Sequence, residues 1–218
     1  MSLIFGGIAR HTGPGLALQE LLYGFIMALL FLTAARFGIL KFDDGMDIVI
    51  LMVGMDFTWG MIDAVLFYVV GVMDQERMIN VMRSSSSPKD KADELLGDFD
   101  GTPMGLINPV EERKFCEQIM EAELEGEESI RKDRANMMKS SFFCFIATIS
   151  PLVPTALPLL LFEDIYDGML VSSVLASVSM FVLGWMMGKY IGVKGWKSGL
   201  IVAVITWAIT LAATFTGG

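Results

Sequence analysis

The sequence predicts an all-α membrane protein with five transmembrane helices and a cytoplasmic helical insert between helices 2 and 3. Two observations predict this class. First, 54% of the 218 residues are hydrophobic and the mean hydropathy is +0.58, whereas soluble domains are about 45–50% apolar. Second, charge is concentrated in residues 74–139 and is sparse elsewhere. A bilayer imposes such segregation because one span requires about 20 mostly apolar residues.

Five apolar stretches are long enough to cross a bilayer. Their predicted bounds are Leu16–Leu40, Met46–Met73, Ser140–Phe162, Gly168–Tyr190 and Lys197–Phe215. The predicted organisation is therefore transmembrane helices 1 and 2 in residues 1–73 and transmembrane helices 3–5 in residues 140–218. Between them, residues 74–139 form an acidic cytoplasmic insert that is a candidate metal-binding domain.

The distribution of lysine and arginine predicts the orientation, because cytoplasmic loops are enriched in both. Of the 16 basic residues, only Arg36 and Lys41 lie near the loop between spans 1 and 2. The loop between spans 3 and 4 and the C-terminal tail have none, so the other 14 lie on the side of the insert. We expect an integral, multi-pass protein, in the cell membrane if prokaryotic, with a cytoplasmic N-terminus and an external C-terminus.

Two helices are predicted within the insert. Residues 91–99 favour a short helix. Asn108 and Pro109 are typical first residues of a second one, because Asn caps free backbone N–H groups and Pro tolerates the first turn. This second helix can extend to Met138 and enter span 3, with Gly126 as its weak point.

Composition excludes several functions. The net charge of −9 argues against nucleic-acid binding, which requires a basic patch. Cys116 and Cys144 offer no disulfide framework, and the single histidine, His11, cannot build a multi-histidine zinc site. The sequence has no phosphate-binding loop, nucleophile elbow or HExxH motif. We therefore expect a protein that is not an enzyme.

Acidic residues within the predicted spans are the main functional signal. Asp56 and Asp63 lie seven residues apart in span 2 and share a helix face. Glu20 lies in the first turns of span 1, with Met27 on the same side. A charged residue near the bilayer centre costs roughly 2.5–3.5 kcal/mol, and such residues usually mark an ion or proton path. The alternative is a protonated, hydrogen-bonded acid in a static helix contact.

The 17 methionines and a run of glutamates suggest metal ligands. Thioether sulfur is a soft ligand and carboxylate a hard one, so a mixed site suits a borderline metal such as iron(II); ordinary apolar packing is the alternative. Glu117, Glu121, Glu125 and Glu128 are spaced to form one stripe on a helix, where their repulsion would be relieved by a cation. A solvated helix face explains the same spacing.

Span 3 contains three prolines within Ser150–Pro158. Proline removes a backbone donor, so this helix is expected to be kinked or broken. Broken backbone at membrane depth is tolerated where it is buried in protein or lines a cavity. The segment therefore fits either a transporter or a simple packing kink.

The layout resembles the vacuolar iron transporter (VIT) family, which has five spans and a cytoplasmic metal-binding insert between spans 2 and 3. Three stretches carry the resemblance, and together with the layout it covers nearly the whole chain. They are Ser141–Pro154 with a Pro-Leu-x-Pro element, Phe181–Tyr190 followed by Gly195–Leu200, and Gly54–Asp63.

The resemblance assigns roles to particular residues. The family's span 2 acid falls on Asp56, and its Ser-Met pair falls on Asp63-Ala64, so the methionine ligand is missing and an extra acid lies beside its position. The family's Asp-Gly at the start of span 1 is absent, and Glu20 is the nearest acid. The glutamates of the insert match as a class. The candidate metal ligands there are Glu117, Glu121, Glu125, Glu128, Met137 and Met138.

The resemblance implies a homodimer that exports iron(II) or manganese(II) from the cytoplasm in exchange for protons. Metal would be captured by the insert and pass along a path formed by Glu20, Asp56, Asp63 and Met27. Its partners would be lipid, divalent cations and protons, with no permanent cofactor. The alternative is a non-transporting membrane sensor or scaffold whose insert binds metal or a partner. A ferritin-type oxidase is disfavoured by the near absence of histidine.

Overall fold

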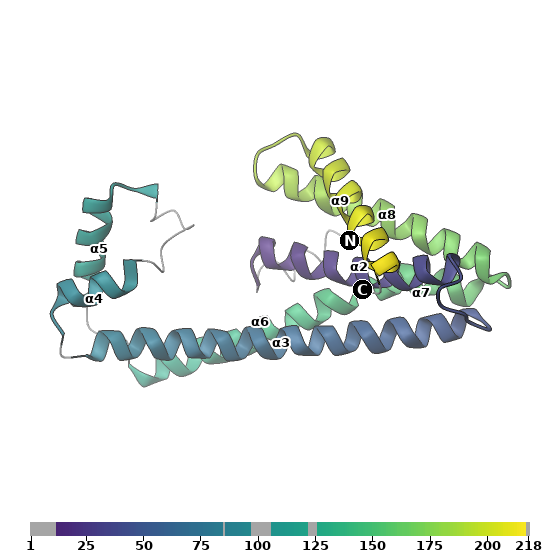
Figure 1. The fold of residues 1–218 in the computed structure, drawn as a ribbon. Coiled ribbons are helices and arrows are strands. Elements are labelled where there is room, and N and C mark those ends of the chain that lie inside the picture. The colour runs from purple at the N-terminus through teal and green to yellow at the C-terminus, as the bar shows by residue number, and fades with distance from the viewer. Residues whose placement is uncertain (1–11, 85, 97–105, 122–125, 217–218) are drawn as a thin grey trace. The chain divides into compact units, whose positions relative to one another are not determined.

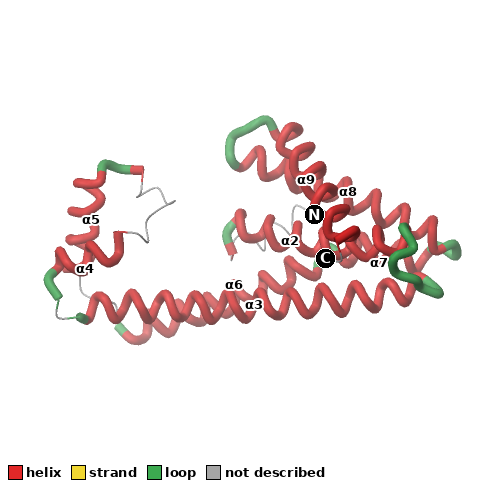
Figure 2. The backbone as a smooth tube through the Cα atoms, in the orientation of Figure 1, coloured by secondary structure: helices red, strands yellow, loops and turns green. Residues whose placement is uncertain are grey.

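A computed structural model describes residues 12–84, 86–96, 106–121 and 126–216. Within these ranges the chain forms helices joined by short loops, without a strand (Figures 1 and 2). The helices are α2 (Pro14–Arg36), α3 (Gly45–Arg83), α4 (Pro88–Leu95), α5 (Pro109–Glu121), α6 (Glu127–Ile149), α7 (Leu152–Leu161), α8 (Ile165–Tyr190) and α9 (Gly195–Thr216). The predicted all-α class is confirmed.

Among the described residues, five helical segments are long and apolar enough to cross a membrane, in agreement with the predicted five spans. They are Pro14–Arg36, Gly45–Arg83, Glu127–Leu161, Ile165–Tyr190 and Gly195–Thr216. Two bounds differ clearly from the prediction: the second segment continues past Met73, and the third begins well before Ser140. Both extensions are rich in Glu, Arg, Lys and Gln. These residues favour helix, but they are too polar to be predicted as part of a membrane span.

The helices of the charged segment begin where the capping residues predict. Asn108 Oδ1 accepts a hydrogen bond from the backbone N–H of Val110 at 3.0 Å, at the start of α5. Ser87 Oγ accepts one from the N–H of Asp90 at 3.2 Å, at the start of α4. These bonds satisfy N–H groups that have no partner within the helix.

The third span is broken at its first proline, as predicted. α6 ends at Ile149 and α7 begins at Leu152. Pro151 has no N–H to bond the carbonyl of Ala147, and the hydroxyl of Ser150 donates to that carbonyl at 2.9 Å instead. The break is therefore stabilised by a side chain, and the end of α6 lies within the membrane unit.

The membrane part of the chain is one compact unit, formed by the described residues up to Phe67 and from Met138 onward. In it, α8 packs against α7 and α9, and α2 packs against α7, α8 and α9. Its buried centre includes Phe25, Leu29 and Leu32 of α2 with Met180 and Leu183 of α8. Many large apolar side chains of α3 and α9 are exposed, as a lipid environment allows.

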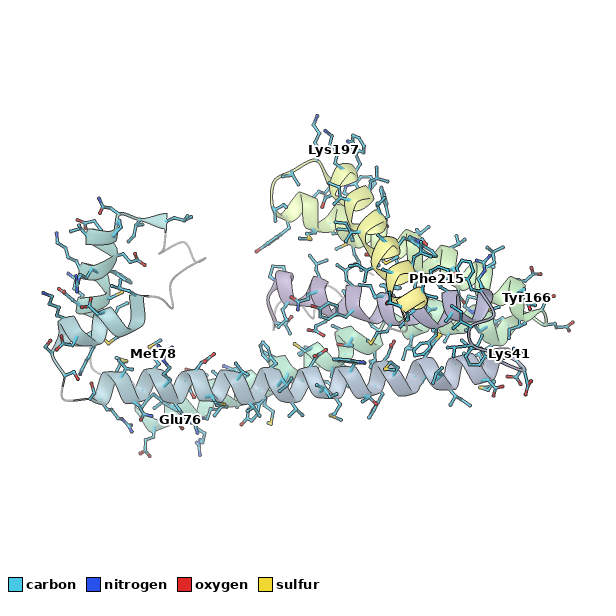
Figure 3. The ribbon with its side chains drawn as sticks, viewed as in Figure 1. Lys41, Glu76, Met78, Tyr166, Lys197 and Phe215 are labelled. Atoms are coloured by element: carbon cyan, nitrogen blue, oxygen red, sulfur yellow. The ribbon has the colours of Figure 1, made fainter. Side chains whose placement is uncertain are left out.

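Two loops of this unit meet at one end. Lys41 from the α2–α3 loop and Tyr166 from the start of α8 lie close together (Figure 3), and both line a cavity of about 410 Å³. Lys197 lies beyond the opposite end of α8, in the first turn of α9. The first and third inter-span loops therefore share one end, as an up-and-down five-span arrangement requires.

Residues 68–137 form a second compact unit. Within it α4 packs against α5, and Arg113 of α5 forms an ion pair with Asp93 of α4. Glu76 (Figure 3), on the part of α3 that belongs to this unit, pairs with Arg134 of α6. A small apolar cluster holds the same unit together; it consists of Val81, Met120, Met78, Met82 and Ile119.

Cys116 is a buried cysteine of the second unit. It is free and only 1% exposed. Burial, together with the nearby charge of Glu112, raises the pKa of its thiol. Because the thiolate is the reactive and metal-binding form, this cysteine is a packing residue at neutral pH.

Candidate functional site

Glu20 is a buried acid at a contact between two membrane helices. It lies on α2 and is only 4% exposed. The hydroxyl of Thr148, on α6 and fully buried, donates a hydrogen bond to Glu20 Oε2 at 2.8 Å. A carboxylate in apolar surroundings requires such a donor, so Thr148 fixes the position of one carboxyl oxygen.

Asp63 joins Glu20 from a third helix. It lies on α3, is half-buried, and its side chain is within hydrogen-bonding contact of Glu20. Two carboxyl groups can share a hydrogen bond only when one of them carries a proton. A cation placed between them relieves the same repulsion, so the pair can hold either one proton or one cation.

Two glycines let α2 and α3 approach α6 beside this acid pair. A Cβ on Gly24 of α2 would lie 2.2 Å from the backbone oxygen of Thr148 and 2.8 Å from Cγ of Pro151. A Cβ on Gly60 of α3 would lie 3.3 Å from Cβ of Thr148. The close approach of three helices at Thr148 therefore depends on the missing side chains.

Replacing Gly24 by Ala is expected to lower the free energy of unfolding by about 1–3 kcal/mol, because the added methyl group overlaps a backbone oxygen that cannot move alone. Thermal unfolding of the purified protein in detergent measures the change. Gly54→Ala is the matched control, since a Cβ at Gly54 meets nothing within 4 Å. Equal stability of the two variants would contradict the packing described here.

Asp56 is the most isolated acid of the membrane unit. It lies on α3, seven residues before Asp63, and is fully buried. Neither carboxyl oxygen has a hydrogen-bond partner among the residues that the structure describes. A buried acid without a hydrogen-bond partner is destabilising. An acid with a purely structural role would instead be hydrogen-bonded in a static contact between helices.

The sequence profile of the VIT family matches residues 66–218, more than two thirds of the chain. The chain belongs to the VIT family. No curated protein and no solved structure gives a match.

VIT family membership makes the protein a multi-pass membrane protein of a family of metal cation transporters, which are not enzymes. The match includes the break in span 3 and Thr148, but it begins after Asp63. Membership therefore rests on the end of α3, the charged segment and the last three spans. The interpretation of Glu20, Asp56 and Asp63 rests on their geometry.

In this VIT family chain the glutamates predicted to form one stripe do not share a helix. Glu117 and Glu121 belong to α5 and Glu128 to α6, while Gly126 lies outside both helices. The predicted continuous helix through Gly126 is wrong, because glycine adds no helix-stabilising side chain there. Glu125 lies outside the described residues. The role of all four as metal ligands stays a prediction.

The predicted methionine ligands lie in varied surroundings. Met27 of α2 is half-buried, seven residues after Glu20. Met137 is half-buried, and its Sδ would lie 3.5 Å from a Cβ on Gly71. Met138 is 61% exposed. In the part of the chain that the structure describes, no three His, Cys, Asp or Glu residues are close enough to hold a metal ion.

Thr148 was not predicted from the sequence. Threonine is common in membrane helices, where its hydroxyl usually bonds the carbonyl four residues earlier. Thr148 has that bond, to the carbonyl of Cys144 at 3.1 Å, and so looks ordinary in sequence. Its contact with Glu20 spans 128 positions of the chain. Only the packing of α2 on α6 reveals it.

Proposed function

We propose that this VIT family member exports a divalent metal cation, iron(II) or manganese(II), from the cytoplasm in exchange for protons. The observation that supports the proposal is the acid pair of Glu20 and Asp63, which meets inside the membrane unit next to Thr148. Ionisable residues at that depth are expensive and usually mark an ion or proton path.

The acid pair suits exchange because protons and metal compete for the same oxygens. With a divalent cation bound, both carboxylates are ionised and their repulsion is offset. Without it, one proton must return to the pair for the two groups to share a hydrogen bond. Cation release and proton uptake are then linked, as metal binding by protonatable ligands generally is.

Asp56 extends the same path along α3. It lies on the face that carries Asp63, two turns away, and none of the described residues forms a hydrogen bond with its side chain. A second acid on this face gives a departing cation a further carboxylate, or a proton a further carrier. Met27 would add a soft ligand on the α2 side, suited to iron(II).

The second unit would capture the cation before transport. Its candidate ligands are Glu117, Glu121, Glu125, Glu128, Met137 and Met138. Because the first two glutamates and the fourth lie on different helices, capture would require α5 and α6 to bring them together. The proposed assembly is a homodimer in the lipid bilayer, with the N-terminus in the cytoplasm.

Manganese(II) uptake into proteoliposomes under an imposed pH gradient tests the proposal. The wild type is expected to move manganese(II) only when the gradient favours proton exchange. The double variant Asp56→Asn with Asp63→Asn is expected to lose this flux, because no carboxylate of α3 remains on the path. Asp43→Asn, in the loop before α3, controls for the loss of an exposed carboxylate away from the path. Wild-type flux in the double variant would refute the mechanism.

A non-transporting sensor or scaffold is the second candidate, and one observation favours it. Glu20 already has a hydrogen-bond donor in Thr148 and a contact with Asp63, as in a static helix contact. This candidate predicts that the purified protein binds manganese(II) through residues 68–137. It also predicts no flux in proteoliposomes under any pH gradient.

A further inference from the structure

The hydroxyl group of Thr148 has one proton and two acceptors. Its Oγ lies 2.8 Å from Glu20 Oε2 and 3.1 Å from the backbone oxygen of Cys144. A single O–H bond can point fully at only one of them. Rotation about the Cβ–Oγ bond exchanges the two partners without moving a heavy atom, so this buried hydroxyl has two available states.

The acid pair alone cannot complete a cation site. Manganese(II) and similar hard cations take about six oxygen ligands, and no third acid, cysteine or histidine joins Glu20 and Asp63 among the described residues. Apart from the thioether of Met27 proposed above, the remaining ligands must therefore be neutral oxygens or water. Thr148 Oγ is a neutral oxygen already in contact with Glu20 and fully buried.

The spacing of the two oxygens fits coordination to one metal. Neighbouring ligands of an octahedral cation with bonds of about 2.0–2.1 Å lie roughly 3 Å apart. Thr148 Oγ and Glu20 Oε2 are 2.8 Å apart. If these two oxygen atoms move slightly apart, a cation can lie between them and bind both in place of the hydrogen bond.

Building on the proposed transport function, we propose that Thr148 is a direct oxygen ligand of the transported cation, together with Glu20 and Asp63. In the empty site the hydroxyl proton points at Glu20. When the cation enters, the proton turns to the carbonyl of Cys144, and an oxygen lone pair faces the metal. The hydroxyl of Thr148 thus exchanges its hydrogen bond to Glu20 for one to the carbonyl of Cys144, and the proton shared by Glu20 and Asp63 leaves the pair as the cation enters.

The isosteric variant Thr148→Val tests the role of the oxygen. It keeps the shape of the side chain, and it is expected to raise the manganese(II) concentration for half-maximal uptake about tenfold or more, with a smaller change in maximal rate. Thr148→Ser keeps the hydroxyl and is expected to retain near wild-type affinity. Thr155→Val is the matched control, because Thr155 is equally buried and bonds the carbonyl four residues earlier.

A change of ligand atom gives a second, independent readout. Thr148→Cys replaces a hard oxygen by a soft sulfur, so it is expected to shift preference from manganese(II) toward cadmium(II). Thr155→Cys controls for an added thiol elsewhere in the membrane unit. This readout compares two metals on the same protein and does not depend on the yield of folded transporter.

The outcomes separate the inference from the proposed function. If Thr148→Val has wild-type affinity for manganese(II), or if Thr148→Cys keeps the wild-type preference for manganese(II) over cadmium(II), Thr148 is not a ligand. If Glu20→Gln nevertheless abolishes uptake, the proposed path along the acids stands. If Glu20→Gln also transports normally, the proposed path itself is wrong. A defect in Thr148→Ser as large as that of Thr148→Val would indicate packing and overturn the inference.

Discussion

Replacing Glu20 by Gln is expected to reduce manganese(II) flux by about 100-fold or more, the upper end of what loss of a supporting group at a metal site costs. The amide has nearly the same shape and can still accept the hydrogen bond from Thr148. It cannot carry the negative charge that attracts the cation, nor the proton that replaces it. The variant therefore removes the charge and the exchangeable proton of Glu20 and leaves the packing of α2 largely intact.

A double-mutant cycle sharpens this prediction. Because Glu20 and Asp63 are in contact and hold one cation or one proton between them, Asp63→Asn should cost a similar factor. The double variant should then be little worse than either single one, since residues that act as a unit are non-additive. Glu163→Gln, in the loop before α8, is the control. Fully additive losses would mean that the two acids act separately.

Replacing Asp56 by Leu is expected to change stability and transport in opposite directions. The carboxyl group of Asp56 is fully buried, and both its oxygens lack hydrogen-bond partners in the described part of the chain. Removing an unsatisfied buried polar group should raise the free energy of unfolding by about 1–3 kcal/mol. The same change removes a carboxylate from the path and should abolish flux. Proteins often sacrifice stability in this way at functional sites.

Unfolding in detergent and flux in proteoliposomes, measured on the same preparation, test this prediction. Met52→Leu is the matched control, because Met52 is also fully buried, one turn earlier on α3. An exchange of one apolar side chain for another of similar size should change stability by less than about 1.5 kcal/mol and preserve flux. A destabilised Asp56→Leu variant would indicate that Asp56 has a polar partner after all.

The membrane layout could be predicted from the sequence because lipid imposes it. Backbone groups cannot stay unpaired in a bilayer, so apolar stretches of sufficient length must be helices. The break at Pro151 followed from the absence of a backbone N–H. The start of α5 followed from Asn108 and Pro109 for equally local reasons. In each case the cause lies within a few residues of the effect.

The candidate site could be predicted only in part, because it depends on contacts between helices distant in sequence. Glu20, Asp56 and Asp63 could be predicted as candidates because they are acids within apolar stretches. That Glu20 contacts Asp63, and that Asp56 is left alone, depends on which faces of α2 and α3 pack inward. The hydrophobic pattern does not reveal those faces, because membrane helices are apolar all round. Thr148 carried no sequence signal for the same reason.

The length of α3 has a consequence for its place in the bilayer. Its 39 residues correspond to roughly 58 Å at 1.5 Å per residue, about twice the hydrocarbon thickness of a bilayer. No proline interrupts it. A straight helix of this length cannot be contained in the hydrocarbon layer, so its last turns, which begin with Asp74 and Glu76, emerge into water without a break in the backbone.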